Sequence, residues 1–194
     1  HNLTLMSDES YCQILYEQKH FSLGKSGMQE NLVIVGSLSK TYSMTGWRVG
    51  FALGPAQLMS EMLSLQSHST SNPTSIAQKA AVEALCGPQD AVKTMLDEFR
   101  RRRDRVVEGL RSIPGVTCNM PQGAFYAYPN VGEHLGGEGA KDILELTGTL
   151  LDQTHVAVVP GDAFGTEAHI RISYATSVEQ IDEGLRRLKE FFKS

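Results

Sequence analysis

Lys40 follows an apolar, β-branched run over residues 32–35, in a segment of small polar residues that continues to Arg48. Partial desolvation and neighbouring cations lower the pKa of a lysine, and the freed amine can act as a nucleophile. The hydroxyl of Ser37 and the planar donors of Arg48 suit a phosphate group. These residue types predict a lysine-bound, phosphorylated carbonyl compound such as pyridoxal phosphate (PLP). Composition alone also allows a surface lysine in a serine-rich loop.

Two further residues would serve the same cofactor. Asp8 and Tyr11 follow another apolar run, residues 3–6. In an α/β sheet the ligand crevice lies at the carboxyl ends of the strands, so Asp8 and Tyr11 could share a crevice with Lys40. PLP requires a carboxylate that keeps its pyridine nitrogen protonated and a phenol that hydrogen-bonds its 3′ oxygen. Without Lys40, a turn or cap role would be the better interpretation of Asp8.

The elements that position these residues alternate strands with helices in the first half of the chain. Apolar runs predict strands over 3–6, 32–35 and 48–54. Apolar spacing near 3.6 residues predicts helices over 59–65, 76–85 and 90–112. The Ser/Thr-rich stretch 64–75 predicts a loop that could meet a ligand or partner. The run Arg100–Arg103 is interpreted as the solvated face of the long helix.

The second half of the sequence has a different pattern of predicted elements. Short strands are expected over 116–118, 124–128, 156–159 and 169–174, with helices over 140–153 and 178–192. The first section is therefore predicted to be α/β and the last α+β. We place the boundary within the long helix, which gives one domain over residues 1–97 and another over 98–194.

The composition of the chain disfavours several classes of function. The 194 residues contain 18 Lys+Arg and 22 Asp+Glu, a net charge of −4 that disfavours nucleic-acid binding through a basic surface. No apolar run reaches the roughly 18 to 20 residues of a membrane span, and no targeting segment is evident. Cys12, Cys86 and Cys118 form no C-x-x-C pair, so a disulfide framework or zinc site is not expected and a cytoplasmic location is the default.

Several segments together resemble one family. They are 7–11, 37–50, 66–78, 123–126, 158–165 and 170–174, which occur in the order and spacing of fold-type I, class I/II aminotransferases. The similarity is greatest to the aspartate aminotransferase branch and covers essentially the whole chain. It implies an α/β fold in which residues 1–97 form the C-terminal part of the PLP-binding large domain and residues 98–194 form the α+β small C-terminal domain.

The resemblance also implies a role for each site residue. Lys40 would hold PLP as an imine and act as the catalytic base, Asp8 would pair with the pyridinium, and Tyr11 would contact the 3′ oxygen. Ser37 and Arg48 would bind the phosphate, and Arg171 would bind the α-carboxylate of the substrate. The remaining candidates are three histidines that match no catalytic position of the family and no metal spacing, so we expect them to be structural: His68, His155 and His169.

The implied reaction is transamination between an L-amino acid, aspartate first, and an α-keto acid, 2-oxoglutarate first. Family members work as homodimers and carry an N-terminal half that this sequence lacks, so the chain is expected to be an incomplete portion with poor activity alone. A PLP-dependent β-lyase, a relative of the cyclopropane-carboxylate synthases and a non-catalytic PLP-sensing domain remain as alternatives, because fold alone does not fix the reaction.

Overall fold

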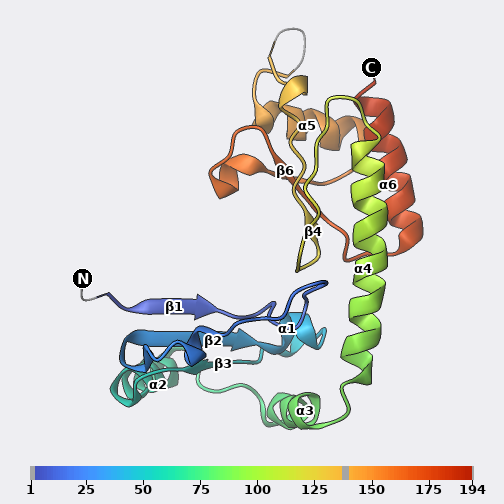
Figure 1. Ribbon diagram of the computed structural model, residues 1–194. Helices are drawn as coiled ribbons and strands as arrows, with labels where there is room; N and C mark the ends of the chain where they lie inside the picture. The colour runs from blue at the N-terminus through green and yellow to red at the C-terminus, as the bar shows by residue number, and fades with distance from the viewer. Residues whose placement is uncertain (1–2, 137–139, 194) are drawn as a thin grey trace. The chain divides into compact units, whose positions relative to one another are not determined.

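The computed structural model describes residues 3–136 and 140–193 (Figure 1). The chain divides into two compact units, His1–Leu96 and Asp97–Ser194. We describe each unit by itself. No helix among the described residues is both long enough and apolar enough to cross a membrane.

Unit 1 contains a three-stranded sheet in the order β1-β2-β3. The strands are β1 (Leu5–Asp8), β2 (Leu32–Ser37) and β3 (Gly50–Leu53). β1 and β2 are parallel, with Asp8 opposite Val35, and β2 and β3 are antiparallel, with Ser37 opposite Gly50. β2 is the central strand and contributes the buried Leu32 and Val33. The two pairings set the positions of the segments that directly follow β1 and β2.

The third strand begins two residues later than the sequence predicts. Arg48 has a φ of 56°, in the left-handed region, where a strand cannot continue. It ends a 3-10 turn, Thr45–Trp47, and β3 begins at Gly50. Arg48 is therefore a turn residue at the entrance to β3.

The helices of unit 1 are α1 (Leu38–Thr41), α2 (Ala56–Ser69) and α3 (Ser75–Cys86). The predicted loop over 64–75 is wrong in its first half, because α2 continues to Ser69. The serine hydroxyls explain the difference: Ser67 donates to the carbonyl of Ser64 at 2.7 Å and so bonds within the helix instead of competing with it. A small core joins α1 to α3 through Leu38, Met44, Val49, Ala77 and Ala81.

Helix α4 (Asp90–Arg111) corrects the interpretation of the arginine run. Arg103 is 4% exposed and lies on the same stripe as the buried Phe99, Val106 and Leu110, at helical spacings of three and four residues. Its guanidinium donates to the carbonyl of Pro121 at 3.1 Å and to the carboxylate of Asp104 at 2.9 Å. The other three arginines of the run pair with Asp97 or Glu98 nearer the surface.

Unit 2 contains a second sheet in the order β4-β6-β5, with antiparallel pairings. The strands β4 (Tyr126–Ala127), β5 (Val159–Pro160) and β6 (Ile170–Ser173) are shorter than predicted. The strand expected over 116–118 is only a bridge between Thr117 and Asn130. That expected over 156–159 begins at Val159 and includes Pro160.

Helices α5 (Ile143–Thr154) and α6 (Val178–Phe191) complete unit 2. The helix predicted over 140–153 begins three residues later than expected, because Ala140 forms a bridge with Leu135 and Asp142 is the N-cap of α5. The C-terminal part of α4 runs beside α6, where Arg105 pairs with Asp182 (Figure 1). Buried side chains of α4, α5 and β6, including Val107, Leu150 and Ile170, form the core of this unit.

Candidate active site

The carboxyl ends of β1 and β2 bring the first group of predicted site residues to one edge of the sheet. Asp8 is the last residue of β1, and the backbone N–H of Glu9 donates to the carbonyl of Val35 at 2.8 Å. Two residues after Val35, β2 ends at Ser37 and α1 begins. Parallel pairing therefore places Asp8, Ser37 and Lys40 on neighbouring chain segments at the same edge.

Lys40 lies in the single turn of α1. Ser37 starts this turn as the N-cap, since its hydroxyl accepts a hydrogen bond from the N–H of Ser39 at 3.1 Å. The ammonium nitrogen of Lys40 lies 6.0 Å from the centre of the Tyr11 ring. Tyr11 follows β1 in sequence, so the contact joins the segments that extend from the two parallel strands. The predicted Lys40–Tyr11 neighbourhood is thus present in the structure.

Asp8 is an exposed carboxylate that stabilises its own turn. Its Oδ1 accepts hydrogen bonds from the hydroxyl of Ser10 at 2.6 Å and from the N–H of Ser10 at 3.0 Å. These two bonds lower the pKa of Asp8 below its ordinary value, against a small opposing effect of burial. Among the described residues both bonds fall on Oδ1. Asp8 therefore stays ionised near neutral pH.

Arg48 is brought toward Ser37 by the pairing of β2 with β3. Ser37 lies opposite Gly50, and the N–H of Leu38 donates to the carbonyl of Val49 at 3.2 Å. The Arg48 guanidinium donates to the carbonyl of Thr45 at 3.0 Å, which leaves most of its donors unused by this bond. Arg48 is exposed and borders an open groove whose other wall is formed by residues from 66 to 77, including Asn72 and Thr74.

Arg171 lies on β6 of unit 2 and was predicted to bind a carboxylate. Its guanidinium carbon is 4.6 Å from the ring centre of Tyr126 and 4.7 Å from that of Phe164. Among the described residues, none hydrogen-bonds or ion-pairs with this guanidinium. Its N–H donors are consequently left for a ligand.

The three histidines lie at two helix ends and in one ring stack. His68 lies in the last turn of α2, and His155 ends α5 with a φ of 57°. His169 stacks on Tyr128 at 4.9 Å between ring centres and 11° between planes. No group of His, Cys, Asp or Glu among the described residues could hold a metal ion.

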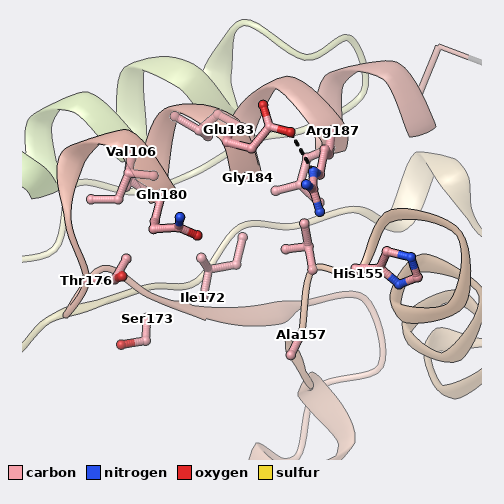
Figure 2. Close-up of a pocket in the computed structure, with 14 residues that line it drawn as sticks. Val106, His155, Ala157, Ile172, Ser173, Thr176, Gln180, Glu183, Gly184 and Arg187 are labelled. Atoms are coloured by element: carbon pink, nitrogen blue, oxygen red, sulfur yellow. Dashed lines mark hydrogen bonds and ion pairs between the residues drawn. The ribbon is translucent and has the colours of Figure 1, made fainter.

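A separate pocket of unit 2 contains none of the predicted site residues (Figure 2). Its wall is formed by the inner face of α6, by β6 and by the segment after α5. Figure 2 shows the ion pair between Glu183 and Arg187 on α6 at the pocket rim, with a distance of 2.8 Å. Arg187 also donates to the carbonyl of Thr154 at 2.9 Å, so it supports the end of α5.

Sequence reasoning did not assign a role to Glu9, Tyr126 or Phe164. Glu9 is 11% exposed in its side chain and binds His20 at 3.0 Å and the hydroxyl of Ser22 at 2.8 Å. These bonds anchor the segment after Tyr11 against β1. Tyr126 and Phe164 belong to the motif segments 123–126 and 158–165, which flank the strand of Arg171 in the sheet. An aromatic residue in each of these segments was the only sequence feature that could have indicated their role.

The two sheets and their covering helices form part of the fold of PLP-dependent transferases. A family model described as "Aminotransferase class I and II" matches residues 1–188. The chain belongs to this family.

Relatives give the comparison in more detail. The chain is 41% identical to an aspartate aminotransferase of Geobacillus stearothermophilus over 100% of this chain and 50% of the relative. It is 44% identical to an aspartate/prephenate aminotransferase of Cereibacter sphaeroides, over 96% of this chain and 49% of the relative. The chain thus spans about half the length of the curated relatives it matches.

Solved structures agree with these relatives. The structure of an aspartate aminotransferase from Rhizobium meliloti matches with a TM-score of 0.93 and 41% identity, over 98% of this chain and 50% of that one. An aromatic aminotransferase from Pyrococcus horikoshii matches with a TM-score of 0.92 and 35% identity, over 100% and 52%. Aminotransferases of differing specificity therefore share this half of the fold.

Proposed function

We propose that this chain is part of a PLP-dependent aminotransferase that transfers the amino group of an L-amino acid, aspartate first, to 2-oxoglutarate. The observation that carries the proposal is the position of Lys40 beside Tyr11, at the sheet edge where the ionised Asp8 ends the neighbouring parallel strand. The names of the relatives support transamination over a β-lyase or a PLP-sensing role.

The residues of unit 1 fit the proposed cofactor. Lys40 would attach it through its amine, Tyr11 would donate to its phenolic oxygen, and the carboxylate of Asp8 would pair with its protonated ring nitrogen. Ser37 and Arg48 would bind its phosphate, and the unused donors of Arg48 are suited to that charge. When bound, PLP supplies an electron sink that stabilises the negative charge left by removal of the Cα proton.

The chemistry of each side chain gives its role in the proposed reaction. The free amine of Lys40 would accept the proton from the substrate Cα as a general base, and the resulting ammonium would then donate that proton as a general acid. Asp8 would supply a negative charge for the ring nitrogen, and its bonds to Ser10 favour that charged form by lowering its pKa. Arg171 binds the α-carboxylate through paired N–H donors and so orients the Cα–H bond.

Two further properties belong to the proposal. We expect the complete enzyme to be a homodimer, as the family resemblance implies. We also place it in the cytoplasm, because Cys12, Cys86 and Cys118 are all free thiols, as is usual in a reducing compartment.

The test is replacement of Lys40 in the complete protein. Lys40→Ala should abolish both turnover and the covalent adduct that borohydride fixes between protein and PLP, which mass spectrometry detects. Lys79→Ala, which removes an exposed lysine of α3, is the matched control and should keep both. A Lys40→Ala protein that still gives the adduct would refute the assignment.

The products separate transamination from the alternatives. One equivalent of amino acid should convert the bound cofactor to its amine form and release a keto acid. Release of ammonia and pyruvate would indicate a β-lyase, and cofactor binding without any turnover would indicate a sensing domain.

A further inference from the structure

The guanidinium of Arg171 has an unusual environment for a cation that would bind substrate. Two aromatic rings lie close to it, Tyr126 at 4.6 Å and Phe164 at 4.7 Å. Cations over aromatic faces are attracted at distances up to about 6 Å, and arginine adds stacking to this attraction. Both distances fall well within that range.

The two rings come from different sides of β6. Tyr126 belongs to β4, which pairs with β6 so that Tyr126 is opposite Ser173. Phe164 belongs to the 3-10 turn Gly161–Phe164, which follows β5, the other neighbour of β6. The sheet order β4-β6-β5 therefore brings one ring from strand β4 and one from the turn after β5 to Arg171 on the central strand.

Phe164 is 46% exposed, yet its ring is held. Tyr128 meets it edge to face at 5.9 Å and 87°. Tyr128 is itself fixed, because its hydroxyl hydrogen-bonds that of Thr166 and its ring stacks on His169. A ring supported in this way can hold a guanidinium at one angle.

We propose that Phe164, together with Tyr126, is a positioning residue that orients the Arg171 guanidinium for a substrate carboxylate. The inference rests on the proposed function and deepens it. The rings attract the guanidinium through their faces and accept no strong hydrogen bond, so the planar fork of N–H donors remains available. Orienting a long side chain before binding reduces the entropy lost when the ligand arrives.

The binding experiment uses the complete protein loaded with PLP in its aldehyde form, titrated calorimetrically with 2-oxoglutarate. A keto acid alone cannot complete a turnover with this form, so the isotherm measures binding. Phe164→Leu should weaken binding about three- to tenfold, and Tyr126→Leu similarly. Phe164→Tyr, which keeps the aromatic face, should restore binding to within about twofold of the wild type. Phe21→Leu, at another exposed phenylalanine, is the matched control and should bind like the wild type.

Steady-state kinetics give a second readout. A residue that holds the carboxylate equally in ground and transition states should raise KM while leaving kcat nearly unchanged. A general loss of folding would instead lower the active fraction and the melting temperature without this split.

The binding results distinguish failure of the positioning role from failure of the carboxylate assignment. If Arg171→Leu weakens binding but Phe164→Leu and Tyr126→Leu do not, the positioning role is wrong and the proposed function stands. If Phe164→Tyr weakens binding as much as Phe164→Leu, the aromatic face is not what matters and the inference fails. If Arg171→Leu binds like the wild type, the carboxylate assignment fails and this inference fails with it.

Discussion

Asp8 shows how one side chain can satisfy two interpretations of the same sequence. Its Oδ1 accepts two bonds from Ser10, as a turn residue does, and those bonds lower its pKa, which favours the charged form that a partner for a protonated ring nitrogen needs. The sequence presented these roles as alternatives. In the structure the turn contacts favour the charged form of Asp8, so the two roles are compatible.

Glu9, next to Asp8, is the residue whose titration should affect stability. Burial raises the pKa of Glu9, but hydrogen bonds from Ser22 and His20 lower it more, and the pKa falls below its ordinary 4.5. The unfolded chain therefore binds a proton more readily than the folded one, so the contribution of Glu9 to stability is present above pH 4.5 and is lost as pH falls through the folded-state pKa.

Glu9→Gln tests this contribution by chemical denaturation at several pH values. At pH 7 the variant should be less stable by about 1 to 2 kcal/mol, because the charged hydrogen bonds are lost. The difference from the wild type should shrink as the pH is lowered below about 4.5. A difference that stays constant down to pH 3 would show that Glu9 contributes through packing alone.

At the scale of elements, periodicity predicted the long helix closely and the short strands poorly. Helix α4 has the predicted start and ends one residue early, since 22 residues give a strong pattern. β4 and β5 have two residues each, and partners decide their ends: Val159 and Pro160 are strand residues because Arg171 and Ile170 lie opposite them. Such pairings are not visible in local sequence.

Arg103 is the residue of α4 whose structural role could not be predicted from composition. Four consecutive arginines in an acidic protein indicate a solvated face, yet a helix turns about 100° per residue and cannot expose all four. The fourth falls on the apolar stripe, where its donors bind the carbonyl of Pro121 and so connect α4 to the turn before Tyr126. The preceding Phe99, one turn earlier, stacks on Phe125 of the same segment at 5.2 Å.

Replacing Arg103 should therefore destabilise the protein more than replacing its neighbours. Arg103→Ala removes a buried cation and leaves the Pro121 carbonyl unsatisfied, which should cost about 2 to 4 kcal/mol in the free energy of unfolding. Arg101→Ala, at a side chain 65% exposed, should change it by about 0.5 kcal/mol or less. Equal effects of the two substitutions in thermal or urea unfolding would contradict the structural role.

At the scale of the whole molecule, unit 1 leaves many large apolar side chains exposed. Met6, Leu65 and Ile76 are each more than 70% exposed, on β1, α2 and α3. A monomer rarely leaves so many large apolar side chains in water. These surfaces are suited to association with other polypeptide.

We therefore expect the 194-residue chain alone to self-associate. Sedimentation velocity over a range of concentrations should show species larger than a monomer, and Leu65→Glu combined with Ile76→Glu should shift the distribution toward the monomer. A chain that stays monomeric at all concentrations would show that these side chains are tolerated in water.

The sequence predicted the placement of the unit 1 residues at one sheet edge better than the surroundings of Arg171. Lys40, Asp8 and Ser37 lie on local segments whose strands pair in parallel, and that arrangement follows from apolar runs and a general rule for α/β sheets. The rings of Tyr126 and Phe164 reach Arg171 only through the order β4-β6-β5. Strand order is a long-range property, which explains why motif positions alone gave these aromatics no role.

Arg48, at a φ of 56°, has a consequence for engineering. For residues other than glycine, this backbone conformation costs roughly 1 to 2 kcal/mol in conformational energy. A library screened only for heat resistance would therefore favour glycine at position 48, and the same substitution would delete the guanidinium proposed to hold the phosphate. Thermostability and cofactor retention should be selected together at this residue.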